Sequence, residues 1–283
     1  MNVARVAFQG EEGAYSESAI CAFFGHKVSS LPRRTFADVF ECVQKDEADA
    51  AVIPIENSIE GSVNQNFDLL LMHDLLIRGE VVLKINHCLI SNPDVDLEMI
   101  KTVYSHPQAL AQCSAFLKDL GRDIVPSYDT AGSVKMIKER GLRDAAAVAS
   151  ERAATLYGMK VLAKDIADLP NNLTRFLVLS KTDSPPTGKD KTSVVMSVKH
   201  VPGSLYEALG ELARRGINMT KIESRPTKHT PWEYNMFIDF EGHREEKVCG
   251  EALDGLKKRS LYLKVLGSYP ASSGPVDSND LAL

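Results

Sequence analysis

The chain lacks several features that would place it in a particular class of proteins. Its five cysteines are scattered, odd in number and without a C-x-x-C pair, which argues against a disulfide framework or a zinc site. Its net charge of -5 argues against a basic surface that would bind nucleic acid. No apolar run approaches the ~18 residues that a membrane-spanning helix needs. The seven histidines show no metal-ligand spacing and no complete nucleotide-binding loop appears, so we expect neither a metal nor another cofactor.

What is present is an ordinary composition, 44% hydrophobic and 25% charged, over 283 residues. Such a composition is typical of globular proteins, and the length favours roughly two domains. The chain opens on "VARVAFQG", which has the pattern of a strand and not of a basic, apolar signal peptide. We therefore expect a cytoplasmic protein with reduced thiols.

Strand and helix patterns alternate over residues 3–180. One helix is predicted after Thr35, a suitable N-cap, by four apolar residues at helical spacing. A single helix is predicted from Pro107 to Gly121, residues that suit a helix start and a helix stop. Repeated strand–helix units predict parallel sheets with helices on their faces. The extended segment 80–91 is a candidate crossover between two lobes.

Five strand-to-helix junctions carry small, hydroxyl and amide residues. They are "FQGEEGAYSES", "PIENSIEG", "YSHPQAL", "SYDTAGS" and "VASERA". The segment "NNLTRF" adds Asn172, Thr174 and Arg175 just before an apolar strand, where a turn is the simplest explanation of the polar residues. Ligands of parallel sheets bind at the carboxyl ends of the strands, beside helix N-termini. Capping explains any one junction, but five together indicate a cleft for a polar, anionic ligand.

The pattern changes after a linker that is rich in proline and charged residues. Residues 192–270 have the order strand, helix, two strands, helix and strand, which is typical of a ferredoxin-like domain. The last segment, 271–283, is polar and is expected to be disordered.

Four strings resemble, in this order, the signature segments of the prephenate dehydratase family: "GEEGAYSESA", "PIENSIEGSV", "SHPQALAQC" and "NNLTRFLVL". The C-terminal part resembles an ACT regulatory domain and holds "ESRP" (223–226), a segment of the family's phenylalanine-binding signature. The resemblance implies a two-lobed, periplasmic-binding-protein-like (type II) α/β catalytic domain followed by a ferredoxin-like βαββαβ ACT domain. The implied boundaries are 1–182 for the catalytic domain (one lobe of 1–80 plus 161–182, the other of 81–160), 183–191 for the linker, 192–270 for the ACT domain and 271–283 for the tail.

The resemblance also implies an activity and the residues that perform it. The family converts prephenate to phenylpyruvate, carbon dioxide and water in phenylalanine biosynthesis, with no metal or organic cofactor. The implied catalytic residues are Thr174, Glu56, Asn57 and Gln108, and the implied substrate contacts are Ser105, Thr130, Arg175 and Asn172. L-phenylalanine is the implied effector, with contacts at Gly203, Ser204, Leu205, Asn218, Glu223, Ser224, Arg225 and Pro226. Pairing of ACT domains implies a homodimer or homotetramer, without nucleic-acid or membrane partners.

The chemistry suits these residue types. Prephenate is a dianion, so its carboxylates need N–H donors, and Arg175 is a candidate. The substrate loses carbon dioxide and a hydroxyl group, and the departing oxygen needs a proton or a strong hydrogen bond. A threonine hydroxyl is a weak acid, so we expect Thr174 to donate a hydrogen bond or to relay a proton from a neighbour.

Two other functions remain open from the sequence. Arogenate, the aminated analogue of prephenate, is an alternative substrate, and a non-catalytic cytoplasmic amino-acid sensor is an alternative role. One motif departs from the family: the usual Gly-Ala-Leu-Val of the regulatory domain is Gly203-Ser204-Leu205-Tyr206 here. The larger tyrosine ring either caps the effector pocket or crowds it.

Overall fold

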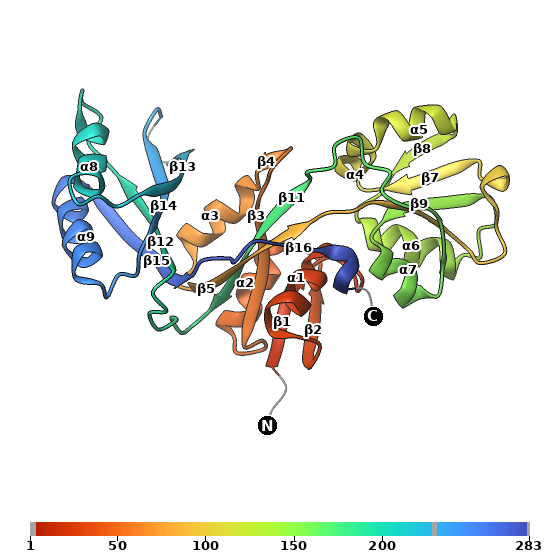
Figure 1. Ribbon diagram of the computed structural model, residues 1–283, viewed down its shortest axis with the longest axis horizontal. Helices are drawn as coiled ribbons and strands as arrows, with labels where there is room; N and C mark the ends of the chain where they lie inside the picture. Colours follow the sequence, from red (N-terminus) through yellow and green to blue (C-terminus); the bar gives the residue numbers. More distant parts are fainter. Residues whose placement is uncertain (1–3, 228–230, 282–283) are drawn as a thin grey trace. The chain divides into compact units, whose positions relative to one another are not determined.

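The computed structural model describes residues 4–227 and 231–281, which form three β-sheets with flanking helices (Figure 1). Contacts between residues divide the chain into two compact units. The first unit comprises 1–63, 81–176 and 274–283, and the second comprises 64–80 and 177–273. The second unit thus combines one helix of the N-terminal region with the C-terminal domain.

The first sheet has the strand order β16-β5-β11-β3-β1-β2, and the short β4 pairs with the end of β3. Its strands are β1 (Ala4–Gln9), β2 (Val28–Arg33), β3 (Ala50–Asn57), β4 (Gly61–Ser62), β5 (Leu76–Lys84), β11 (Leu173–Ser180) and β16 (Pro275–Asp277). The helices are α1 (Tyr15–Phe24), α2 (Phe36–Gln44) and α3 (Asn64–Met72). Strand β1 is parallel to β2 and β3, as the alternating pattern predicts. The predicted N-cap is confirmed, since Thr35 forms a capping box with Asp38.

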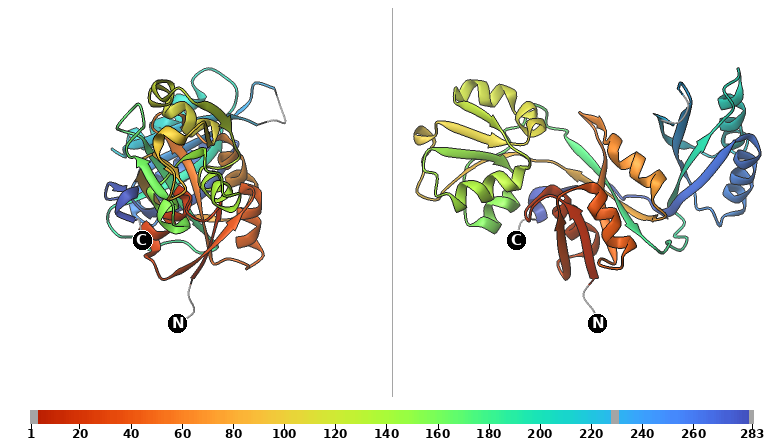
Figure 2. Two further views of the ribbon diagram at one scale, coloured as in Figure 1. Left: turned by 90° about the vertical axis from the view of Figure 1, so that its right-hand side faces the viewer. Right: turned by 180° about the vertical axis from the view of Figure 1, so that it is seen from behind.

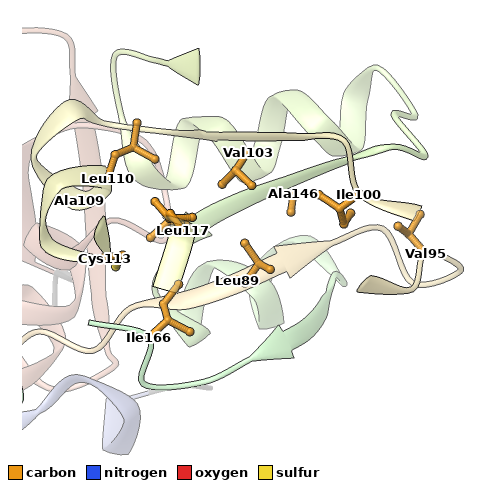
Figure 3. Packing of buried hydrophobic residues seen from close by; sticks show 11 residues of the cluster. Leu89, Val95, Ile100, Val103, Ala109, Leu110, Cys113, Leu117, Ala146 and Ile166 are labelled. Carbon is orange, nitrogen blue, oxygen red and sulfur yellow. The ribbon is translucent and has the colours of Figure 1, made fainter. Parts of the chain in front are cut away.

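The second sheet has the order β10-β6-β9-β7-β8. Its strands are β6 (Cys88–Ser91), β7 (Thr102–Ser105), β8 (Asp123–Pro126), β9 (Ala145–Ala149) and β10 (Lys160–Ala163). The helices are η1 (Leu97–Met99), α4 (Pro107–Gln112), α5 (Ser114–Leu120), α6 (Thr130–Glu139) and α7 (Glu151–Tyr157). Helices α4 and α5 lie on one face and α6 and α7 on the other (Figure 2). Beneath α4 and α5, aliphatic side chains such as Leu89, Val103 and Leu117 form a buried core (Figure 3).

The extended segment 80–91 leads from the first sheet to the second, but the strand pairing differs from the expected lobe borders. Strand β5 remains in the first sheet as far as Lys84, and β6 begins the second sheet at Cys88. Strand β10 pairs with β6, so residues 161–163, which were expected in the first lobe, belong to the second sheet. The expectation of purely parallel sheets was wrong here, because β6 is antiparallel to both β9 and β10.

The single helix predicted from Pro107 to Gly121 is two helices that meet at Cys113, whose φ of -117° is not helical. Asp168 explains the break. Its carboxylate accepts hydrogen bonds from the N–H of Ala115 (3.1 Å) and the hydroxyl of Ser114 (2.8 Å), and so caps the second helix. The predicted stop is correct, since Gly121 has the left-handed φ of 63°.

The third sheet is antiparallel with the order β13-β14-β12-β15, which together with its helices confirms the ferredoxin-like ACT fold. Its strands are β12 (Asp190–Ser197), β13 (Met219–Pro226), β14 (Tyr234–Glu241) and β15 (Tyr262–Pro270), with helices α8 (Ser204–Ala213) and α9 (Lys247–Arg259). Strand β12 begins inside the expected linker. The Asp190 carboxylate accepts from the N–H groups of Thr187 (2.8 Å) and Gly188 (2.9 Å), which orders the turn before it.

Helix α3 packs on the face of this third sheet opposite α8 and α9 (Figure 1). The rings of Phe67 and Phe237 meet edge to face, with centroids 5.0 Å apart. At the end of the helix, the ammonium of Lys264 donates to the carbonyl of His73 (2.8 Å) and pairs with Asp74 (3.0 Å). A lysine of the ACT sheet thus caps a helix from the N-terminal region.

The prediction of a disordered tail was wrong for residues 271–281. Strand β16 pairs in parallel with β5, and the short helix η2 (Ser278–Leu281) packs against α1 and α7. Asp277 accepts a hydrogen bond from the side chain of Asn86 (2.5 Å) and pairs with Lys84 (3.4 Å). These contacts join residues that are far apart in the sequence, so local composition does not reveal them.

Within the described ranges, no helix combines the length and apolarity that crossing a bilayer requires.

Candidate active site

The centre of the candidate site is a hydrogen bond between two strands of the first sheet. Asn57 is the last residue of β3, and Thr174 is the second residue of the neighbouring β11. The amide nitrogen Nδ2 of Asn57 donates to Oγ1 of Thr174 (2.9 Å) and to Oδ1 of Asn172 (2.6 Å). Thr174 and Asn172 are buried, at 9% and 0% exposure. Three residues predicted from the sequence are therefore brought together.

Backbone groups fix the orientation of the Asn57 amide. Its oxygen Oδ1 accepts from the N–H of Ile59 (2.9 Å) and of Glu60 (3.0 Å) in the turn that leads to β4. A backbone N–H only donates, so the atom facing it must be oxygen, and the amide nitrogen must face Thr174. Oγ1 of Thr174 is therefore an acceptor from Asn57, and its own proton remains for donation to another group.

Glu56 and Arg175 lie on the opposite face of the sheet from Asn57 and Thr174. Successive side chains of a strand alternate between faces, and the two residues pair with each other at 3.1 Å. The Arg175 side chain is 11% exposed and that of Glu56 is 31% exposed. The structure thus separates the predicted residues into a neutral group on one face and an ion pair on the other.

Gln108, a predicted catalytic residue, is exposed, and its backbone N–H donates to Nδ1 of His106 (3.3 Å). Gln112, one helical turn later on α4, lies in the site instead. Its Oε1 accepts from Nδ2 of Asn172 (2.8 Å) and lies 2.9 Å from Nε2 of His87. The sequence analysis missed Gln112. The four-residue spacing from Gln108 was the available signal, because residues i and i+4 share a helix face.

Ser105 and Thr130, the other predicted substrate contacts, belong to the second lobe. The hydroxyl of Ser105 is fully buried and donates to the carbonyl of Val148 (2.6 Å). Thr130 begins α6, whose N-cap Asp129 accepts from the N–H of Gly132 (2.7 Å). Burial raises the pKa of Asp129. The Ser105 hydroxyl therefore bonds the protein's own backbone, and Thr130 lies half-buried at the start of a helix.

The predicted effector contacts lie in the ACT domain. Gly203 has a left-handed φ of 86° and precedes α8, which begins with Ser204 and Leu205. Asn218 donates to Glu241 (3.1 Å) just before β13. The other four predicted contacts are the last residues of β13, namely Glu223, Ser224, Arg225 and Pro226. Within the second unit, the guanidinium of Arg225 lies 3.7 Å from Asp68 on α3.

Among the residues that the structure describes, no group of three or more His, Cys, Asp or Glu side chains is arranged to hold a metal ion. His87, the histidine in the candidate site, is 2% exposed, and its burial lowers its pKa.

Comparisons with known proteins agree with this description. The family profile of prephenate dehydratase matches residues 6–184, and that of the ACT domain matches residues 192–251. A chloroplastic protein of Arabidopsis thaliana, named arogenate dehydratase/prephenate dehydratase 2, is 45% identical over 280 residues, which cover 95% of this chain and 73% of the relative.

Two solved structures resemble the whole chain. One is described as prephenate dehydratase from Arthrobacter aurescens in complex with L-Phe. It is 35% identical, with a TM-score of 0.87, over 94% of this chain and 89% of the other. The second is described as a novel type of quorum quenching acylase. It is 37% identical, with a TM-score of 0.88, over 95% of this chain and 98% of the other.

Proposed function

Since this chain belongs to the prephenate dehydratase family, a family of hydro-lyases, we propose that it converts prephenate to phenylpyruvate, carbon dioxide and water. The observation that carries the proposal is the hydrogen bond from Asn57 to Thr174. It joins two signature segments of the family at one buried point. Because Thr174 accepts this hydrogen bond, its own hydroxyl proton is available for donation to the substrate.

The reaction needs a donor at the departing oxygen. When the ring carboxylate leaves as carbon dioxide, its electron pair enters the ring, and the hydroxyl at the opposite carbon departs as the ring becomes aromatic. Thr174 accepts from Asn57 and directs its own proton at that hydroxyl. A donor in this position contributes about 10²–10⁴-fold to the rate. The donation needs no ionised threonine, because hydrogen bonding alone stabilises the developing negative charge.

Glu56 and Arg175 have a supporting role in this proposal. Their ion pair joins β3 to β11 beside Asn57 and Thr174, on the other face of the sheet. It therefore helps to maintain the alignment of the two strands that the Asn57–Thr174 hydrogen bond requires. The substrate carboxylates would then bind mainly to N–H donors, since the charge of Arg175 is already balanced.

The test is direct. Purified protein is incubated with prephenate, and phenylpyruvate is detected by its absorbance in alkali. Turnover supports the proposal. A folded protein that binds prephenate without releasing phenylpyruvate would instead be a sensor.

Arogenate is the second candidate substrate, because the Arabidopsis relative is named for both substrates. The two molecules differ in the side chain, which is an amino acid in arogenate and a keto acid in prephenate. Arogenate would yield phenylalanine directly. Comparison of kcat/KM for the two substrates decides between them, and a preference for arogenate would change the substrate and leave the role of Thr174 unaltered.

We further propose feedback inhibition by L-phenylalanine through the ACT domain. The Arthrobacter protein, described as a complex with L-Phe, supports this proposal. The N–H groups at the start of α8, near Gly203 and Ser204, suit the effector carboxylate, and Leu205 suits its ring. The assembly is a homodimer or homotetramer with paired ACT domains. The five cysteines are free and buried, which suits the reducing cytoplasm.

Calorimetric titration of L-phenylalanine into the full chain tests the regulation. Coupling of effector to substrate is typically about 5–150-fold in affinity and is reciprocal. The Leu205→Ala variant should keep its turnover without effector and lose much of its sensitivity to phenylalanine. Equal inhibition of variant and wild type would place the inhibition elsewhere, and no binding at millimolar concentration would mean that Ser204 and Tyr206 have abolished the site.

A further inference from the structure

The polar group around Thr174 continues into a longer chain of hydrogen bonds. From Asn172 it passes to Gln112, then to the ring of His87 and to the hydroxyl of Tyr15. The successive heavy-atom distances are 2.8, 2.9 and 2.9 Å. The Tyr15 hydroxyl ends the chain by donating to the carbonyl of Asn86 (2.6 Å). Asn172 precedes β11, Gln112 ends α4 and Tyr15 begins α1, so the chain joins both lobes of the first unit.

The direction of every donor in this chain follows from the backbone at one end. The N–H groups of Ile59 and Glu60 fix Asn57 so that its nitrogen faces Asn172. Oδ1 of Asn172 must therefore accept, and its Nδ2 must donate to Gln112. That donation requires an oxygen of Gln112, and the same oxygen faces Nε2 of His87. Nε2 must then carry a proton, because two acceptors cannot share a hydrogen bond.

The opposite end of the chain completes the assignment for His87. Burial lowers the pKa of His87, which favours the neutral ring at neutral pH. A neutral ring protonated at Nε2 has a lone pair on Nδ1, which faces the Tyr15 hydroxyl at 2.9 Å. The single proton of Tyr15 is thus shared between His87 and the carbonyl of Asn86. Donation from Tyr15 to Nδ1 stabilises the tautomer that the Gln112 oxygen requires.

We propose that Tyr15 and His87 are positioning residues for the dehydration, acting on Thr174 through Gln112 and Asn172. The terminal torsion of a glutamine is broad and nearly two-fold, so Gln112 depends on its partners for orientation. Nε2–H of His87 keeps the Gln112 oxygen in place, and that oxygen keeps Asn172 turned toward Asn57. Backbone N–H groups orient the Asn57 amide, and Asn172 accepts one hydrogen of its nitrogen, so the other hydrogen stays aligned with Thr174 and the threonine proton is left for the substrate. This inference rests on the proposed dehydratase function.

The Tyr15→Phe variant tests the proposal, because it removes one oxygen and keeps the ring. We expect kcat to fall about three- to tenfold, the range for one hydrogen bond, with KM changed less than about twofold. Tyr157→Phe is the matched control. Its hydroxyl also donates to a backbone carbonyl, that of Glu12 (3.0 Å), and we expect its kcat to be unchanged.

A double-mutant cycle separates positioning from a purely structural role. Gln112→Met preserves the length of the side chain and removes the amide that connects His87 to Asn172. In that background Tyr15→Phe should have no further effect on kcat, because the connection is already broken. Effects that multiply, as for independent sites, would overturn the proposal.

The protonation of His87 is measured without turnover, by nitrogen-15 NMR of the histidine rings. We expect Nε2 of His87 to be protonated in the wild type, and an unprotonated Nε2 would overturn the proposal. This measurement distinguishes the two ideas. A protein with protonated Nε2 and no activity on prephenate or arogenate would retain the hydrogen-bond chain and refute the proposed function.

Discussion

Replacing Thr174 by valine removes one hydroxyl and preserves the shape of the side chain. The structure predicts a small cost in stability, because Asn57 loses one of two acceptors and keeps Asn172 at 2.6 Å. One hydrogen bond corresponds to about 1 kcal/mol, or about 2–4 °C in Tm. The predicted cost in catalysis is much larger. Loss of the donor at the departing oxygen should lower kcat about 10²–10⁴-fold, which is about 2.7–5.4 kcal/mol in the barrier.

The assay follows phenylpyruvate release at saturating substrate for the wild type and for the Thr174→Val and Thr174→Ser variants. Serine preserves the donor and should retain more activity than valine. Thr192→Val is a suitable control, because its buried hydroxyl bonds Gly242 (2.7 Å) and Ser268 (2.8 Å) inside the ACT domain. It should lower Tm at least as much as Thr174→Val and leave kcat unchanged. A kcat of Thr174→Val within about fivefold of wild type would fall outside the range expected for a proton donor and remove Thr174 from the mechanism.

Three further predictions concern the rest of the molecule. Turnover should survive EDTA and desalting, and activity restored by one specific metal would reveal a site that we have missed. Deletion of the chain from Gly274 onward should lower Tm by several degrees, since it removes Asp277 from Lys84 and Asn86, whereas an unchanged Tm would mean that β16 contributes no stability. Three arginines hold the pKa of Glu211 at about 2, below its ordinary 4.5, so its contribution to stability is complete above 4.5 and is lost as the pH falls toward 2. Urea unfolding of Glu211→Gln and wild type should therefore differ more at about pH 6 than at about pH 3, and an equal difference would contradict this linkage.

The sequence predicted the parts of the fold that local patterns determine. The helix after Thr35 depends on its cap and on apolar spacing, and it was predicted correctly. The break at Cys113 was missed, because the cap that causes it comes from Asp168. Strand β16 was missed for the same kind of reason, since its partner β5 lies almost two hundred residues earlier.

The candidate site shows a similar division. Asn57, Asn172 and Thr174 were predicted as members of one site, and the structure brings them together. The sequence analysis placed Glu56 and Arg175 in the same site as Asn57 and Thr174, although the alternation of side chains along a strand indicates that they face the other way. The choice between two glutamines on one helix face required the positions of Asn172 and His87, which only the folded chain provides.

The packing of α3 on the ACT sheet affects how this protein can be divided. The family match for the catalytic domain ends at residue 184, which invites expression of that segment alone. Such a polypeptide would expose the ring of Phe67 and leave the end of α3 without the ammonium of Lys264. When regulatory domains are exchanged between relatives, the segment 64–80, which contains α3, should therefore be exchanged together with the ACT domain. The best point for joining two relatives therefore differs from residue 184, where the family match ends. A hybrid joined at residue 184 would pair α3 of one relative with the ACT sheet of another.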